Sequence, residues 1–174
     1  FNICEYGFLE MLNNAIDHSE GTAVVINTEW ASDSIKIGFS DDGVGIFKKI
    51  KKTLNLKDER ESALHLSKGK FTTDPENHTG EGIFFTSRAF DEFLITSREM
   101  SYVRENSEHD WFIEQVKGPH LPGTRLEMAI SLGSERKMQE VYAQYQHEDS
   151  EGMPKFDKTH IIAQLSMLGD ERYV

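Results

Sequence analysis

The chain has 174 residues, of which 30 are acidic and 19 are basic, so its formal charge at pH 7 is −11. This length favours one compact domain with an additional segment, and it allows a sizeable core without disulfides. One cysteine, Cys4, excludes an internal disulfide framework, and the acidic balance disfavours broad nucleic-acid binding, which needs a cationic surface. No apolar run approaches the ~20 residues that span a bilayer and no signal peptide is visible, so we expect a cytoplasmic protein that does not contact membranes.

The first third of the chain predicts a helix followed by a β-hairpin. Residues 3–18 are predicted to be helical because apolar side chains recur at helical spacing, namely Phe8, Leu9, Leu12 and Ile16. Gly21 is expected to cap this helix in a left-handed conformation. Residues 22–29 and 34–40 predict the two strands of the hairpin, since apolar side chains alternate along the second of them.

The middle of the chain predicts short helices and a loop. A solvated helix is expected over the lysine-rich residues 48–52, and a second helix is expected to begin at Asp58, with Glu61 completing a capping box. Gly, Thr, Asp, Pro and Asn dominate residues 68–78, which predicts a mobile loop. The remaining predicted elements are a helix at 82–90, strands at 92–97, 110–116 and 124–130, a polar helix at 135–146, an acidic linker at 147–152 and an amphipathic piece at 159–168. This order predicts an α+β two-layer sandwich with helices on one face of a mixed, largely antiparallel sheet.

Three local patterns carry candidate chemistry, and each also has an ordinary structural interpretation. Glu10 and Asn14 are four residues apart and project from one helix face, which is equally typical of a solvated stripe. Asp41-Asp42-Gly43-Val44-Gly45 follows a strand, where glycines permit a close approach to a flat ligand, although Asp-Gly is also a common turn. His78-Thr79-Gly80-Glu81-Gly82 precedes a helix, whose exposed N–H groups can bind an anion, but such a glycine pair alone is weak evidence.

The combination is more specific than any of its parts. The motifs occur in the order Glu-x-x-x-Asn, Asp-x-Gly-x-Gly, loop, Thr-Gly-x-Gly and a Gly123-Thr124 pair that opens a strand. In this order the chain resembles the GHKL ATPase superfamily, which includes gyrase-type topoisomerases, ninety-kilodalton heat-shock chaperones, histidine kinases and mismatch-repair ATPases. The resemblance covers residues 1–131 and implies a domain that binds ATP or ADP with Mg²⁺.

The resemblance implies a role for each matching residue. Asn14 corresponds to the asparagine that holds Mg²⁺, and Glu10 to the general base of the hydrolysing branches and of serine-kinase anti-sigma factors. Asp41 corresponds to the aspartate that recognises the adenine amino group, and Gly43 and Gly45 to the glycines that shape the floor of the purine pocket.

The phosphate side of the site is implied in the same way. Thr79, Gly80 and Gly82 correspond to the second glycine box, and Thr124 to the threonine that supports the adenine aspartate. His18 lies where relatives line the pocket, although a packed or capping histidine fits as well. Side chains expected in a lid over the γ-phosphate, or else in a solvated loop, are Lys68, Lys70, Thr72 and Thr73. The second box lacks the third small residue and the leucine of histidine kinases, so we expect its phosphate contacts to differ from theirs.

These matches lead to expectations about function and organisation. We expect an ATP-binding domain of a bacterial-type regulatory protein that hydrolyses ATP or phosphorylates a protein hydroxyl. The alternatives are a nucleotide switch without turnover, a histidine-kinase catalytic domain and an interaction domain without nucleotide. Because the chain begins at Phe1 we expect it to be truncated, and residues 132–174 are expected to be a linker toward a missing, STAS-like domain. A protein partner or a covalently linked regulatory domain is expected, and no direct contact with nucleic acid.

Overall fold

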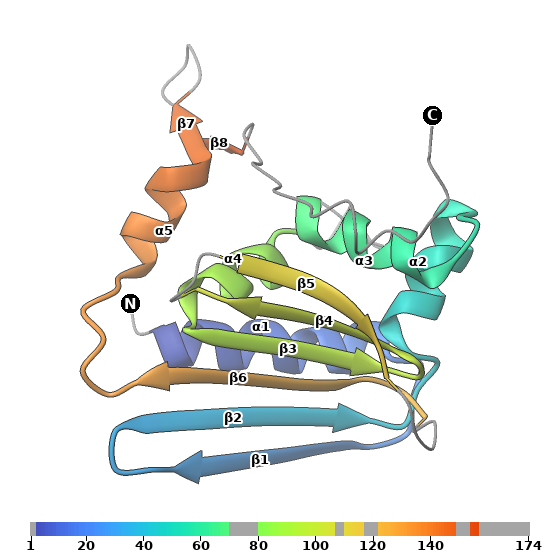
Figure 1. Cartoon of the computed structure of the whole chain (residues 1–174), viewed down its shortest axis with the longest axis horizontal. Coiled ribbons are helices and arrows are strands. Elements are labelled where there is room, and N and C mark those ends of the chain that lie inside the picture. Colours follow the sequence, from blue (N-terminus) through green and yellow to red (C-terminus); the bar gives the residue numbers. More distant parts are fainter. Residues whose placement is uncertain (1–2, 70–79, 107–109, 117–121, 149–153, 157–174) are drawn as a thin grey trace.

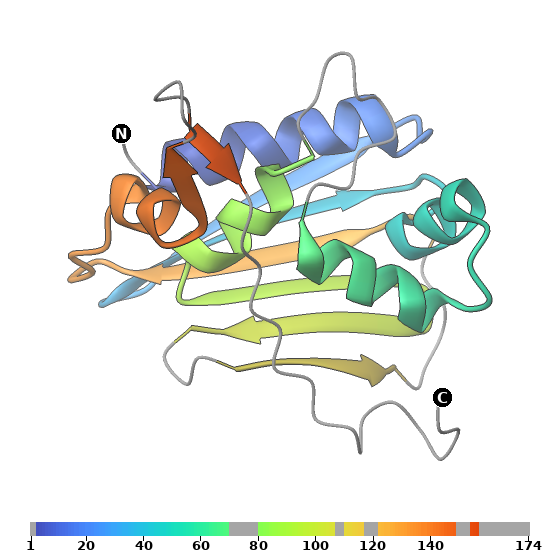
Figure 2. The ribbon, with the colours of Figure 1, turned by 90° about the horizontal axis from the view of Figure 1, so that it is seen from above.

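The computed structural model describes residues 3–69, 80–106, 110–116, 122–148 and 154–156, and shows the predicted α+β two-layer sandwich. Five helices lie on one side of a six-stranded sheet (Figures 1 and 2). The helices are α1 (Ile3–His18), α2 (Ile46–Leu54), α3 (Glu59–Lys68), α4 (Gly82–Ala89) and α5 (Met138–Tyr145). The strands of the sheet are β1 (Val24–Trp30), β2 (Ser34–Asp41), β3 (Glu92–Ser97), β4 (Met100–Glu105), β5 (Asp110–Gln115) and β6 (Arg125–Ser131).

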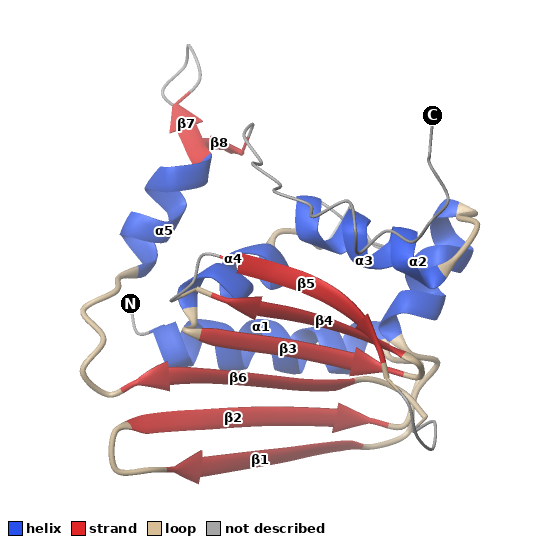
Figure 3. Cartoon of the chain, viewed as in Figure 1, coloured by secondary structure: helices blue, strands red, loops and turns tan. Residues whose placement is uncertain are grey.

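The strand order is β1-β2-β6-β3-β4-β5, and every described pair of neighbours is antiparallel rather than mixed (Figure 3). The late strand β6 therefore lies between β2 and β3. Its register pairs Ser40 with Arg125, and the ladder continues because the N–H of Asp41 donates to the carbonyl of Thr124 at 3.0 Å. Two motifs that are far apart in the sequence thus meet at one end of the sheet.

The core forms where α1 and α4 pack on the middle of the sheet. The side chains of Phe84, Phe85, Phe90, Phe93, Ile95 and Tyr102 are all about 1% exposed or less. Gly7 permits the close approach of α1 to α4, because a Cβ at this position would collide with the ring of Phe90. Burial of large aromatic side chains is the main favourable contribution to such a core.

The buried face of α1 differs from the predicted one. The helix buries Ile3, Gly7, Met11 and Ala15, whereas Leu9 and Ile16 are 46% and 64% exposed. The physical reason is that the helix approaches α4 through its small Gly7, which turns the more apolar stripe partly toward solvent. Periodicity predicted the helix and, in Phe8 and Leu12, part of its packed face, but not the exposure of Leu9 and Ile16.

Several boundaries and caps also differ from the predictions. The helix over 48–52 begins at Ile46 and is not merely solvated, since Phe47 and Ile50 are buried. The left-handed residue after α1 is Glu20, with φ of 57°, and not Gly21. Asp58 caps α3 by accepting from the N–H groups of Arg60 and Glu61, while the Glu61 carboxylate accepts from Lys57 instead of completing the capping box.

The strand β4 was missed, and the segment after β6 has more structure than a linker. The hairpin of β3 and β4 turns at Arg98, whose φ is 56°, without the glycine or asparagine that usually signals such a turn. Beyond α5, β7 (Gln146–Glu148) and β8 (Pro154–Phe156) form a separate two-stranded pair. Most of the predicted loop at 68–78 and the amphipathic piece at 159–168 lie outside the described residues.

The helix α5 packs against α4 and the beginning of α1, as Figure 2 shows. Met138 and Val141 are buried on its inner face, and the ring of Tyr142 contacts the rings of Tyr6 and Phe85. No helix in the described part of the chain combines the length and the apolar character that crossing a membrane requires.

Candidate functional site

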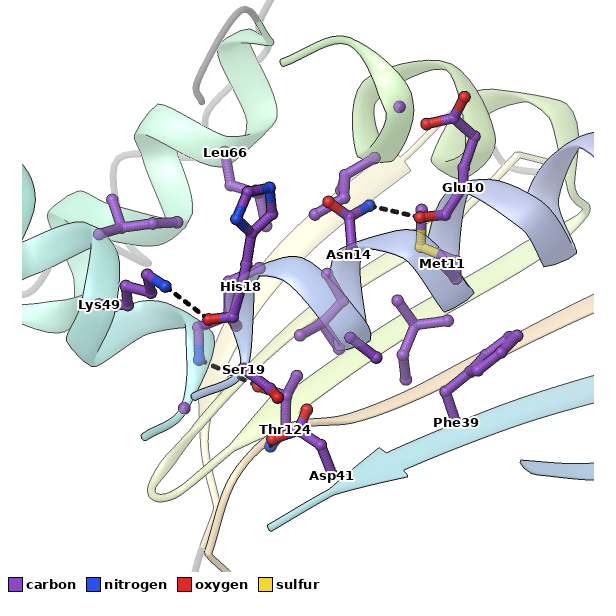
Figure 4. Close-up of a pocket in the computed structure, with 18 of the residues that line it drawn as sticks. Glu10, Met11, Asn14, His18, Ser19, Phe39, Asp41, Lys49, Leu66 and Thr124 are labelled. Atoms are coloured by element: carbon purple, nitrogen blue, oxygen red, sulfur yellow. Dashed lines mark hydrogen bonds between the residues drawn. The ribbon is translucent and has the colours of Figure 1, made fainter. Parts of the chain in front are cut away.

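A cavity of about 280 Å³ lies between α1, α2, α4 and the sheet (Figure 4). The predicted residues that line it come from all four motifs: Glu10, Asn14, His18, Asp41, Gly45, Gly80, Gly82 and Thr124. Gly43 does not line the cavity but hydrogen-bonds to Asp41, which does. Lys70, Thr72, Thr73 and Thr79 lie outside the described residues, and Lys68 ends α3 with an exposed side chain.

Asp41 is fixed at the end of β2 through one of its two carboxylate oxygens. Its Oδ1 accepts from the N–H of Gly43 at 2.9 Å and from the N–H of Thr124 at 3.2 Å. Burial raises the pKa of Asp41, against the opposing effect of these two N–H groups. A carboxylate has about four acceptor positions, so Oδ2 remains available to a ligand that donates a hydrogen bond.

The turn after Asp41 depends on two glycines. Gly45 has φ of 87°, and a Cβ there would come within 2.5 Å of Ser97 Oγ. Gly123 has φ of 73°, and its Cβ would collide with the carbonyl oxygen of Asp41. Thr124 joins the two sides, because its Oγ1 accepts from the N–H of Ile46 at 3.0 Å. Only residues without a side chain allow the strands and α2 to approach this closely.

Asn14 presents its amide oxygen to the cavity. Its Nδ2 donates to the carbonyl of Glu10 at 2.8 Å, one turn earlier on α1 (Figure 4). Because a carbonyl only accepts, the nitrogen must face Glu10 and the oxygen must face the opposite way. An amide oxygen of this kind is a suitable ligand for Mg²⁺.

The opposite end of the cavity is formed by the start of α4. Gly80 has φ of 74°, and Gly82 begins the helix, whose first turn contains no acidic residue. The N-cap residue Glu81 makes no side-chain hydrogen bond to this turn, and the first N–H groups of a helix carry the positive end of its dipole. Such a helix start favours an anionic group.

Glu10 lies beside this helix start. A Cβ on Gly82 would collide with Oε2 of Glu10, so the carboxylate rests directly against the backbone of α4. Burial raises the pKa of Tyr6 and of Tyr142, and the charge of Glu10 adds to the effect on both. The Glu10 carboxylate therefore lies against the start of α4 and near enough to the two phenols to influence their pKa.

Lys49 is a cavity residue that sequence reasoning missed. Its Nζ donates to the carbonyl of His18 at 2.7 Å and pairs with Glu20 Oε1 at 3.1 Å. These contacts join α2 to the end of α1, and the side chain of His18 lines the cavity beside them (Figure 4). A helical period counted from Ile46, with Phe47 and Ile50 inward, would have placed Lys49 at the edge of the buried face.

The middle of the cavity is apolar, which suits a flat, uncharged ring system between the aspartate and the helix start. Its apolar lining consists of Met11, Ala15, Phe39, Ile46, Ile50, Leu66, Ile83, Phe84, Ile95 and Leu126. The described residues contain no group of three or more acidic, histidine or cysteine side chains that could hold a metal ion by themselves. Asn14 could therefore hold a cation only if a ligand supplied further oxygens.

Comparisons with known proteins extend this description only slightly. No protein-family model matches the chain, and no curated protein sequence matches it. Among solved structures, the chain is similar to the 43K ATPase domain of Thermus thermophilus gyrase B, which was solved in complex with an aminocoumarin. The identity is 14%, the TM-score is 0.42, and the match covers 81% of this chain but only 38% of the gyrase chain. Similarity this low assigns neither a ligand nor an activity, and both are inferred from the chain's own residues.

Proposed function

We propose that the cavity binds ATP or ADP and that residues 1–131 form a nucleotide-binding domain of the GHKL type. The observation that carries this proposal is that the separate motifs meet in one cavity. Four motifs that are separated in the sequence by up to about a hundred residues line one cavity, with the aspartate at one end and the helix start at the other. If the motifs were only an ordinary turn, a solvated stripe and an isolated glycine pair, no physical constraint would bring them together in one cavity.

Asp41 would recognise adenine through its remaining oxygen. Its Oδ1 is held by two backbone N–H groups, so Oδ2 is presented in a fixed direction and can accept from the exocyclic amine. The apolar lining between Phe39 and Leu126 would enclose the purine ring. Guanine has a carbonyl oxygen where adenine has this amine, and a carboxylate repels it.

The phosphates would then extend toward Gly80 and Gly82. The N–H groups at the start of α4 and the helix dipole favour their negative charge without any basic side chain, which fits an acidic protein. Asn14 would hold Mg²⁺ through its amide oxygen, and the ion would supply charge neutralisation for the phosphates.

Glu10 is placed to act on the group that attacks the terminal phosphate. Its carboxylate lies against Gly82, where that phosphate would meet the helix. There it can orient a water or a protein hydroxyl and accept its proton as the new bond to the γ-phosphorus forms and the bond to the bridging oxygen breaks, with ADP as the leaving group. We therefore favour ATP hydrolysis or transfer to a protein hydroxyl, within a bacterial-type regulatory protein, over a histidine-kinase role.

The variant Asp41→Asn tests nucleotide binding sharply. The asparagine oxygen can keep both backbone hydrogen bonds, so the fold is preserved, but its amide nitrogen cannot accept from adenine. Calorimetry with ADP and Mg²⁺ should show binding by the wild type and at least a roughly tenfold loss in the variant, since an unmade buried hydrogen bond costs about 1–3 kcal/mol. Asp33→Asn, in the exposed β1–β2 turn, is the matched control. Wild-type protein that binds no ADP would refute the proposal.

Labelled ATP distinguishes the three functions that this site could serve. Release of free phosphate indicates an ATPase, and label on protein indicates a kinase. If ATP binds but stays intact, the domain is a switch in which nucleotide binding changes the affinity for a protein partner or a linked regulatory domain.

A further inference from the structure

A second cavity lies at the opposite end of α4 from the candidate nucleotide site. It has a volume of about 960 Å³, and none of the residues that line it lines the first cavity. Its walls are the last turn of α4, the end of β4, the segment after β6 and one face of α5. We call it the arginine cavity, after the residues that dominate it: Arg88, Arg104, Asn106, Arg136, Lys137 and Tyr145.

Arg88 is a buried charge that forms no ion pair with the acidic side chains in the described part of the chain. Its side chain is 7% exposed, and it donates to the carbonyls of Phe84 and Ser67 at 3.1 and 3.3 Å. The guanidinium carbon lies 3.4 Å from the centre of the Phe84 ring. Its Nε is buried and has no hydrogen-bond partner within the described part of the chain. A buried charge that lacks a counter-ion is costly. The hydrogen bonds to the two carbonyls and to Ser87 Oγ, together with the contact with the Phe84 ring, offset part of that cost, while the Nε donor stays unmatched.

Arg104 adds a second positive charge next to the first. Its Nε donates to Oδ1 of Asn106 at 2.8 Å, which leaves the two terminal nitrogens of the guanidinium for another acceptor. Burial, and then the charge of Arg104, lowers the pKa of Arg88 to about 10. Among the described residues, neither arginine forms an ion pair with a carboxylate, although the chain carries 30 acidic residues.

The acidic groups near the cavity are engaged elsewhere. Asp91 pairs with Arg136 at 3.0 Å, and Glu140 lies 3.9 Å from the exposed Lys137. Glu135 also lines the cavity, but its side chain is exposed to solvent. The inner part of the cavity, with Arg88 and Arg104, is therefore positively charged. The paired charges of Arg136 and Lys137 lie at its rim.

We propose that the arginine cavity binds the phosphate group of a small phosphorylated ligand, held by Arg88 and Arg104. Planar guanidinium groups match the oxygens of a phosphate in pairs, and two of them in one cavity suit a dianion. The cavity is much larger than a phosphate ion, which leaves room for the rest of the ligand beside Tyr145 and α5. This site is independent of the proposed nucleotide site.

Nuclear magnetic resonance of the arginine side chains tests the proposal with small probes. O-Phosphoserine, inorganic phosphate and unmodified serine are each titrated into the whole chain while the Nε–H signals of Arg88 and Arg104 are followed. We expect saturable shifts with both phosphate probes and none with serine. Tighter binding of phosphoserine than of phosphate would show that the ligand is a phosphate ester, and equal binding that phosphate alone is recognised.

Variants of Arg104 separate recognition from folding. Arg104→Gln should weaken phosphoserine binding at least about tenfold, because a charge-assisted pair of hydrogen bonds is lost. Arg104→Lys keeps the charge but not the paired geometry and should lose most of this affinity, so it tests the site even if the glutamine variant folds poorly. Arg60→Gln, on the exposed face of α3, should bind like the wild type. Arginine signals that do not move at millimolar probe, or affinity that the Arg104 variants leave unchanged, would overturn the proposal.

Discussion

Glu10 and Gly82 touch: the carboxylate oxygen Oε2 of Glu10 occupies the place where any other residue at position 82 would put its Cβ. The contact joins the middle of α1 to the first residue of α4. It sets the position of the proposed base relative to the N–H groups that would hold the phosphates. A substitution at Gly82 would therefore change the position of the Glu10 carboxylate more than it would change the stability of the fold.

Gly82→Ala should therefore affect chemistry more than folding. The colliding atom is the end of a flexible side chain, so Glu10 can rotate away at little cost, and alanine favours a helix over glycine by about 1 kcal/mol. We expect a thermal midpoint equal to or above that of the wild type, with ATP turnover reduced at least about tenfold by the misplaced base. Gly133→Ala is the control, because its Cβ would meet only Ser131 Oγ, at 3.7 Å. Unchanged turnover in Gly82→Ala would contradict the role given to this contact.

Glu10→Gln should separate binding from turnover. Glutamine has nearly the same shape but cannot accept a proton from the attacking group. ADP affinity should stay close to that of the wild type, while ATP turnover should fall by about 10²–10⁴-fold, the usual contribution of a general base. Glu5→Gln, on the exposed surface of the same helix, should leave both quantities unchanged. Turnover that survives in Glu10→Gln would remove Glu10 from the mechanism.

The loop next to the site should lose stability in acid through Asp42. Its carboxylate accepts from the hydroxyl and N–H of Thr22 and from the N–H of Ala23, and these bonds lower its pKa to about 2. A depressed pKa means that the stabilisation is fully present above the ordinary value of 3.8 and is lost as the pH falls toward 2.

The matching measurement is the thermal midpoint against pH for wild type and Asp42→Asn. The variant should melt lower than the wild type at pH 6, and the two curves should converge as the pH approaches 2. Asp33→Asn should track the wild type across the range. A difference between wild type and Asp42→Asn that is constant with pH would show that the ionised form makes no special contribution.

Removal of the Met138 side chain should destabilise the domain, although this residue lies beyond the predicted boundary at residue 131. Met138 is 1% exposed, between α5 and the core. Met138→Ala should lower the free energy of unfolding by about 2–5 kcal/mol, as is usual for large-to-small changes in a core. Gln139→Ala, on the outer face, should have little effect. Equal denaturation curves for Met138→Ala and the wild type would mean that α5 is only a linker.

The parts of the site that could be predicted are those with a local signal. Asp41 with its glycines marks the end of a strand, and Gly80 with Gly82 marks the start of a helix, because both positions need special backbone conformations or uncovered N–H groups. Eight of the predicted residues line one cavity, whereas Gly43 does not and Lys70 and Thr79 lie outside the described residues.

The parts that could not be predicted depend on packing between distant elements. Lys49 is one of four lysines in residues 48–52. A helical period places it at the edge of the buried face, but the packing of α2 against the end of α1 decides that it reaches the cavity. The buried stripe of α1 follows from the contact of Gly7 with Phe90, which periodicity cannot reveal. The arginine cavity likewise joins three segments whose separate sequences carry no recognisable motif.

The pairing of Asp41 with Thr124 has a consequence for the stage of folding at which the protein becomes able to bind nucleotide. The N–H of Thr124 and the carboxylate that it holds are 83 residues apart in the sequence. Long-range pairings of this kind form late in folding, because the intervening chain must first be ordered. A chain whose synthesis has not yet reached Thr124 lacks this support for Asp41, so nucleotide binding would report that the central strand has been inserted and the sheet completed.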